Sequence, residues 1–75
     1  SEGKYEVMET GNSSVMAYRK YDEQDDFIIL VNFTSDEQAF EVSSEGYSLF
    51  MHNYEEAAFL AGQLLKPYEA IVLKK

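Results

Sequence analysis

Hydrophobic and polar residues alternate along most of this chain in short runs. In the segment 15–21, for example, Val15 and Ala17 share one face, whereas Met16 and Tyr18 share the other. A period of two is typical of β-strands, as are short runs rich in β-branched and aromatic residues. The strands that we expect are 4–8, 15–21, 27–33, 38–42, 47–53, 63–66 and 70–74.

Clusters of turn-forming and charged residues separate these segments, at 11–14, 22–26, 34–37 and 43–46. Turns that recur roughly every 8 to 12 residues between short strands are typical of antiparallel sandwiches and barrels. The chain has no internal repeat and no linker-like segment. We therefore predict a single all-β domain, 1–75, folded as a small antiparallel β-sandwich of six to seven strands with Greek-key connections.

The segment 55–65 has two readings. Its Glu, Ala, Phe and Leu residues are good helix formers, and Gly62 would end a short helix there. An isolated helix of about two turns is marginally stable, however. We favour a loop that leads into the strand 63–66, followed by a corner or sheet edge at Pro67, which cannot donate to a strand ladder.

Apolar residues occupy both faces of two expected strands. In the first strand, one face carries Phe27, Ile29, Val31 and Phe33, and the other carries Ile28 and Leu30. In the last strand, Ile71 and Leu73 oppose Ala70 and Val72. A sandwich strand needs only one apolar face. We therefore expect one of these second faces, that of Ile28 and Leu30 or that of Ile71 and Leu73, to form an interface, unless a loop at 57–60 covers it.

The composition excludes several classes of protein. The chain has 75 residues, 14 acidic against 6 Lys plus Arg, and a formal charge of −8. This acidity argues against nucleic acid and anionic membranes as partners. The absence of cysteine excludes disulfides, thiol catalysis and cysteine zinc sites, and it suits the reducing cytoplasm. The first residues resemble no signal peptide, so we expect a fragment of a longer protein.

The acidic loop 22–26 is the first candidate for a metal site. Calcium prefers six to eight oxygen ligands, and its best-known loop places Asp at alternate positions before a Gly. Here Gln24 interrupts the series and no Gly follows. We therefore favour a solvated hairpin loop over a calcium site.

Two adjacent acid pairs and one histidine complete the candidate chemistry. The pairs Asp36–Glu37 and Glu55–Glu56 are poorly placed for glycosidase catalysis, because neighbours on a strand point to opposite faces. His52 has neither a nucleophile elbow nor a set of metal ligands in the sequence around it. We expect the acid pairs to be surface charges and His52 to be structural or on the surface, and hence no catalytic, cofactor-binding or metal-binding residue.

Aromatic side chains could instead stack on sugars. The candidates are Tyr5, Tyr21, Tyr47, Tyr54 and Tyr68. A domain of this size needs aromatic residues to fill its core, and the chain has no Trp. We therefore favour core or interface positions for these tyrosines.

Several blocks of the chain resemble a known family. The three main blocks are 15–19, 28–34 and 65–70, with supporting similarity at 3–5 and 47–54. The most specific feature is the pair Asn32-Phe33-Thr34 and Pro67-Tyr68-Glu69-Ala70. In this order and spacing, the blocks resemble the C-terminal β-domain of the α-amylase family of glycoside hydrolases. The similarity is greatest to the branch of oligo-1,6-glucosidase, dextran glucosidase and trehalose-6-phosphate hydrolase.

This resemblance implies an accessory role. The family's catalytic Asp and Glu residues lie on a barrel upstream of this domain, so none can be assigned to this sequence. We therefore expect a domain that caps and stabilises the barrel of a retaining α-glucosidase, with the barrel as its partner in cis and weak self-association when isolated. The alternatives are a carbohydrate-binding module or a protein-interaction sandwich.

Overall fold

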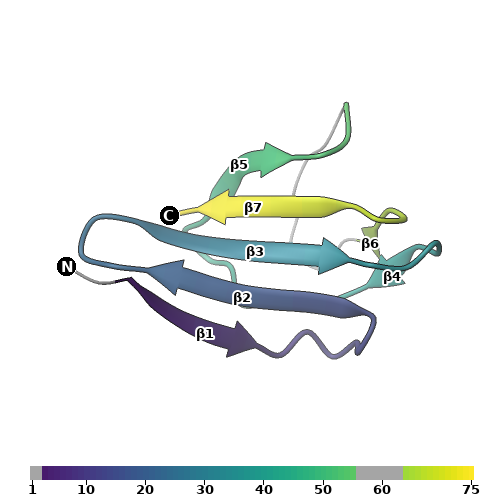
Figure 1. Ribbon diagram of the computed structural model, residues 1–75, viewed down its shortest axis with the longest axis horizontal. Coiled ribbons are helices and arrows are strands. Elements are labelled where there is room, and N and C mark those ends of the chain that lie inside the picture. Colours follow the sequence, from purple (N-terminus) through teal and green to yellow (C-terminus); the bar gives the residue numbers. More distant parts are fainter. Residues whose placement is uncertain (1–2, 56–63) are drawn as a thin grey trace.

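The computed structural model describes residues 3–55 and 64–75, which form two antiparallel β-sheets and no helix (Figure 1). The strands are β1 (Lys4–Met8), β2 (Val15–Tyr21), β3 (Asp26–Asn32), β4 (Gln38–Ala39), β5 (Ser48–His52), β6 (Leu64–Leu65) and β7 (Ala70–Lys74). No helix in these two ranges is long and apolar enough to cross a membrane. The predicted all-β class is confirmed.

The large sheet has five strands in the order β1-β2-β3-β7-β5, and the small sheet pairs β4 with β6. Figure 1 shows the five strands side by side, with β4 and β6 at the right-hand end of the view. The first three strands follow one another as hairpins, whereas β7 returns from the end of the chain to pair with β3. This return places the last strand inside the sheet, where both of its edges are hydrogen-bonded.

The expected strands match the observed ones closely, with one clear exception. The strand predicted at 38–42 ends at Ala39. The reason is that the amide of Glu41 donates to the carbonyl of Thr10, in the loop after β1, at 2.9 Å. The expected strand 63–66 is observed as Leu64–Leu65. The choice between helix and loop falls mostly on residues 56–63, which lie outside the described ranges.

The core lies between the two sheets. Its buried apolar members are Val15, Ala17, Ile28, Leu30, Phe40, Leu65, Ile71 and Leu73. Five of the seven strands or their flanking residues contribute to this one cluster, with Met8, Val42, Tyr47 and Leu49 packed against it. A single shared core of this kind is what allows so short a chain to offset the entropy of ordering it.

The interface predicted for the second faces of two strands is wrong. Ile28, Leu30 and Leu73 are 0% exposed and Ile71 is 4% exposed, so all four belong to the core. The register explains the burial, because Ile28 lies opposite Leu73 and Leu30 lies opposite Ile71 on the face that meets Leu65. The face of Phe27, Ile29 and Val31, which had seemed the natural core face, is the partly exposed one.

Candidate functional site

The surface of the large sheet that points away from the core is the candidate site. Residues directly opposite each other in an antiparallel ladder share a face, so the register defines this surface. We call it the outer face. Its strand positions are Tyr5, Val7, Met16, Tyr18, Lys20, Phe27, Ile29, Val31, Ser48, Met51, Ala70, Val72 and Lys74.

The outer face is apolar across the whole sheet. One line of paired residues crosses all five strands, namely Val7, Tyr18, Ile29, Val72 and Met51. Val7 is 86% exposed, Met51 58% and Met16 49%. Single exposed apolar side chains are ordinary, but a contiguous apolar surface marks a site of interaction.

A register shift in β5 adds a further aromatic ring to this surface. The ladder between β5 and β7 is irregular between Leu49 and Met51. Phe50 consequently reaches Phe27, and the two rings are 5.6 Å apart at a tilt of 50°. Simple alternation would have put Phe50 and Met51 on opposite faces, so the sequence pattern missed this contact.

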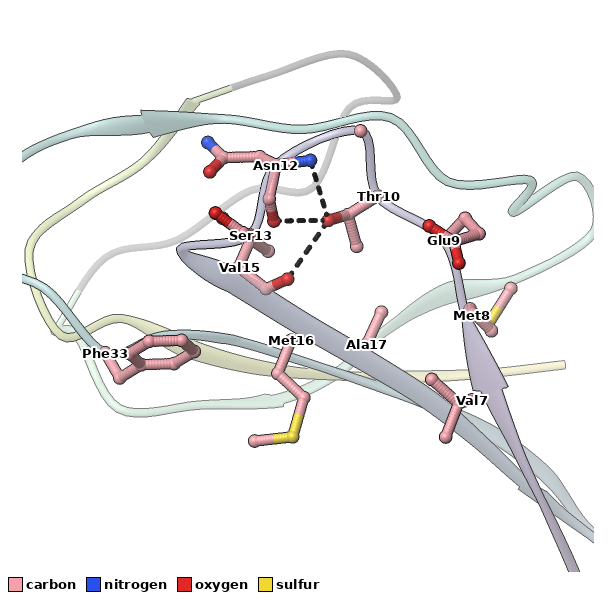
Figure 2. Close-up of a pocket in the computed structure, with 11 residues that line it drawn as sticks. Val7, Met8, Glu9, Thr10, Asn12, Ser13, Val15, Met16, Ala17 and Phe33 are labelled. Carbon is pink, nitrogen blue, oxygen red and sulfur yellow. Dashed lines mark hydrogen bonds between the residues drawn. The ribbon is translucent and has the colours of Figure 1, made fainter.

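One end of the outer face is hollowed (Figure 2). The hollow has a volume of about 560 Å3 and lies where the loop 9–13 leaves β1 and returns to β2. Val7, Met16 and Phe33 supply apolar side chains to it. On the opposite side, Figure 2 shows the hydroxyl of Thr10 donating to the carbonyls of Asn12 and Val15, at 2.9 and 3.0 Å. The loop is therefore held by internal hydrogen bonds while the apolar side stays open.

A polar cluster lies on the opposite, core-facing side of the sheet. Asp26 accepts two hydrogen bonds from Arg19, at 2.9 and 2.7 Å, and one from the hydroxyl of Tyr47, at 2.6 Å. The Arg19 hydrogen bond keeps the pKa of Asp26 below its usual value, and the Tyr47 hydrogen bond lowers it further. Burial, together with the Asp26 carboxylate, raises the pKa of Tyr47. The cluster ties the segment before β5 to β2 and β3.

The acidic loop is organised by its own backbone. The carboxylate of Asp22 accepts hydrogen bonds from the amides of Gln24 and Asp25, at 2.8 and 2.7 Å. These amides lower the pKa of Asp22. Asp26, the last member of the predicted loop, is the first residue of β3 and bonds Arg19. The loop thus forms the hairpin that we favoured.

The remaining polar candidates are on the surface. His52, Asp36 and Glu37 are exposed, and Glu56 lies outside the described residues. Within 3–55 and 64–75, no three metal-ligating side chains come together. Glu55 is exposed as well, and the described members of this set do not come together in a common site.

The five tyrosines considered for sugar stacking are not on one surface. Tyr47 and Tyr54 are partly buried and donate hydrogen bonds, Tyr54 to the carbonyl of Pro67 at 2.6 Å. Tyr21 lies under the guanidinium of Arg19, 3.9 Å from its ring centre. Only Tyr5 and Tyr68 are well exposed, the first at the start of β1 and the second in the turn before β7.

The two most specific blocks of the family resemblance meet in space. Asn32 is fully buried, and its Nδ2 donates to the carbonyls of Asp36, Leu65 and Lys66. The backbone amide of Asn32 donates to Glu69, and the amide of Tyr68 donates to Thr34. These residues therefore join the end of β3 to the turn before β7, which is a structural role.

Comparisons with known proteins agree with this resemblance. No family model matches the chain. It is 34% identical over 77 aligned residues to the oligo-1,6-glucosidase of Bacillus cereus, a match that covers 96% of the chain. The chain spans only 14% of that relative's length.

The solved structures with a similar fold include trehalulose synthase MutB. The enzyme from Pseudomonas mesoacidophila MX-45 matches with a TM-score of 0.76 and 23% identity, over 96% of this chain and 14% of that one. A MutB variant bound to Tris matches with a TM-score of 0.77 and 22% identity, over 97% of this chain and 14% of that one. These structures share the fold of this chain, and the sequence match identifies the chain as a C-terminal β-domain of the α-amylase family.

Proposed function

We propose that this chain is the non-catalytic accessory domain of an α-glucosidase-type enzyme of the cytoplasm, and that its outer face docks on the catalytic barrel of the same polypeptide. The observation that carries the proposal is the contiguous apolar outer face, on a chain that spans only 14% of its relative's length. A surface of this kind is stable in water when another apolar surface covers it.

The energetics favour docking through this face. Complete burial of a large apolar side chain contributes about 1.5–3 kcal/mol relative to exposure. Val7, Met16 and Met51 are 86%, 49% and 58% exposed within this domain. Covering them would stabilise both the domain and the barrel surface beneath it. The hollow beside Met16 can receive a protruding apolar side chain of the barrel.

Capping requires no catalysis by this chain. A retaining glycosidase needs two carboxylates about 5 Å apart across the sugar. The carboxylate of Asp26 is occupied by Arg19 and Tyr47. We expect the isolated chain to release no nitrophenol from an aryl α-glucoside above a buffer blank. Turnover by the pure chain would contradict the accessory role.

A carbohydrate-binding module is the alternative that the exposed aromatic rings bring into consideration. A flat sugar needs an open ring face, yet among the described residues a cationic side chain lies over every candidate tyrosine except Tyr68. Lys20 Nζ is 5.9 Å from the ring centre of Tyr5, and Lys74 Nζ is 5.3 Å from that of Phe50. Capping is therefore the better supported function. A titration with maltose or isomaltose that shifts signals of Tyr5 and Phe50 would favour sugar binding instead.

Methionine oxidation tests the docking directly. Met16 and Met51 lie on the outer face, whereas Met8 packs against the core. Peroxide oxidises exposed methionine preferentially. We expect Met16 and Met51 to be oxidised at least tenfold more slowly in the full-length enzyme than in the isolated chain. Met8, which packs against the core and also lines the hollow, should be protected less. If Met16 and Met51 are oxidised equally fast in the two proteins, docking through the outer face is refuted. The same result would refute an unrelated protein-interaction role of this face within the same polypeptide.

A further inference from the structure

The charges on the outer face differ in sign from those of the rest of the chain. The chain carries 14 acidic residues and a formal charge of −8. No strand position of the outer face is acidic, although two are lysines, Lys20 and Lys74. The strand positions of the outer face therefore carry lysines but no carboxylates, although the chain as a whole is acidic.

Both lysines belong to one end of the outer face. In the register, Lys20 and Lys74 lie on either side of Phe27, and Tyr5 is the next residue beyond Lys20. Met16 and Val31 are paired toward the other end, beside the hollow lined by Glu9. The face thus has two lysines at one end, next to the acidic loop 22–26, an apolar centre, and Glu9 beyond the other end.

Aromatic rings hold the two ammonium groups over this face. Lys74 Nζ lies 5.7 Å from the ring centre of Phe27 and 5.3 Å from that of Phe50. Lys20 Nζ lies 5.9 Å from the ring centre of Tyr5. Cation–π attraction of this kind favours a lysine that lies along the ring surface over one that extends into solvent. A partner that covers the rings therefore also meets the lysines.

Covering these lysines has an electrostatic requirement. An ammonium group that leaves water without an anionic partner loses more solvation than it regains. Lys74 has one carboxylate within this chain, Asp25 at 3.7 Å, in the hairpin loop before β3. Lys20 has no ion pair within the ranges 3–55 and 64–75. Besides the hydrogen bond from the Asp25 amide, the charge of Lys20 lowers the pKa of Asp22, in the same hairpin loop. A docked carboxylate would give Lys20 its first direct ion pair.

We propose that the barrel surface covered by the outer face is apolar at its centre and carries one or more carboxylates opposite Lys20 and Lys74. This inference rests on the proposed docking function, and it adds the chemistry and the orientation of the partner surface. The lysines set which way the domain sits, because in the reversed orientation those carboxylates would face the end of the outer face that has no lysine.

Charge reversal in the full-length enzyme tests the inference. The variant combines Lys20→Glu with Lys74→Glu, and the matched control is Lys4→Glu, an exposed β1 lysine on the other face of the sheet. We expect the double variant to raise the oxidation rate of Met16 and Met51 about tenfold at low salt, and the control to leave it unchanged. A variant with Lys20→Gln and Lys74→Gln should show a smaller rise in the oxidation rate of Met16 and Met51. Salt should not alter this rise, because the two lysine charges that salt would screen are gone.

The outcomes separate the two proposals. If the wild-type enzyme protects Met16 and Met51 and the double variant protects them equally, the carboxylates are not there and this inference fails, while docking stands. If the wild-type enzyme leaves both methionines unprotected, docking itself fails. A lower urea midpoint of the isolated chain that carries both Glu substitutions would reveal its unfolding. In that case the wild-type enzyme and the variant with both Lys→Gln substitutions are compared at low and high salt. If salt changes the protection of Met16 and Met51 in neither protein, the inference is refuted.

Discussion

The side chain of Asn32 donates a hydrogen bond of 2.9 Å to the carbonyl of Lys66, thirty-four positions later in the chain. Nδ2 also reaches the carbonyls of Asp36 and Leu65, while Oδ1 accepts from the amide and the hydroxyl of Thr34. One fully buried amide therefore joins the end of β3, the following turn and the end of β6. All three bonds on Nδ2 are donated by the amide NH2 group, so a carboxylate in its place could not make them.

The first prediction concerns this buried amide. Asn32→Ala leaves several buried backbone groups without partners, and each such loss costs about 1–3 kcal/mol. We expect the free energy of unfolding to fall by roughly 3 kcal/mol, measured from urea titrations followed by circular dichroism. The control is Asn53→Ala, which removes the exposed contacts with Tyr68 and Ala70 and should cost about 1 kcal/mol or less. Equal effects would contradict the role of burial.

The second prediction compares two neighbours on β3. Leu30 is 0% exposed in the core, whereas Ile29 is partly exposed on the outer face. Leu30→Ala should lower the stability of the isolated chain by about 2–5 kcal/mol, because it leaves a cavity. Ile29→Ala should cost only about 1 kcal/mol in the isolated chain. A larger effect of Ile29→Ala than of Leu30→Ala on the urea midpoint would reverse the assignment of the faces.

The third prediction concerns acid. Arg19 holds the pKa of Asp26 below its usual value in the folded state, so the unfolded chain binds this proton more tightly. The stability that the pair contributes is therefore fully present above about pH 4, near the ordinary pKa, and is lost as the pH falls through the lowered value. Urea midpoints at pH 7, 4, 3 and 2 should show this loss.

A substitution isolates the part that Asp26 plays in acid. Asp26→Asn should flatten the decline below pH 4 and lower stability at pH 7 by about 1–2 kcal/mol, because a charge-assisted hydrogen bond is lost. Some decline should remain, since Asp22 also has a lowered pKa. An unchanged acid profile in this variant would exclude Asp26 as its source. At the alkaline end, the raised pKa of Tyr47 predicts stability that is lost as the pH rises through that value.

The fourth prediction concerns the turn before β7. The amide of Glu69 donates to the carbonyl of Lys66, with Pro67 second in the turn and Tyr68 third at a φ of 54°. A left-handed conformation costs a non-glycine residue roughly 1–2 kcal/mol, and the unfolded-state freedom of glycine offsets about 0.5–1 kcal/mol of that. Since the Tyr68 side chain is 61% exposed, Tyr68→Gly should stabilise the isolated chain by roughly 0.5 kcal/mol.

The control for the turn is Tyr68→Ala, which keeps the left-handed conformation and its cost. This variant should not stabilise the chain in thermal or urea unfolding. If both variants destabilise it alike, the tyrosine ring contributes contacts that outweigh the strained backbone.

The fifth prediction concerns self-association of the isolated chain. The uncovered outer face should bring copies together weakly, while the charge of −8 opposes them. Association measured by sedimentation equilibrium should therefore strengthen as salt screens the repulsion. Met16→Glu should reduce it, whereas Glu41→Gln, an exposed change away from the outer face, should not. A strictly monomeric chain at millimolar concentration and high salt would contradict this expectation.

Local chemistry was enough to predict most of the strands, although the one expected at 38–42 ends at Ala39. Alternation along 15–21, the apolar run after Asp26 and the turn residues between them depend on neighbours in the chain, so they are visible in the sequence. The acidic hairpin loop follows from the same kind of signal, because Asp22 bonds amides two and three residues ahead.

Tertiary contacts decided which face of each strand is inside. A run such as 27–33 is apolar on both faces, so its period of two carries no direction. The direction came from distant partners, with Leu30 set opposite Ile71 and Asn32 bonded to Lys66. The irregularity that brings Phe50 to Phe27 likewise depends on pairing between β5 and β7. The sequence thus determined most of the strands and the family of this domain. Long-range register determined its core and its outer face, because the two apolar sides of a strand such as β3 differ only in what packs against them.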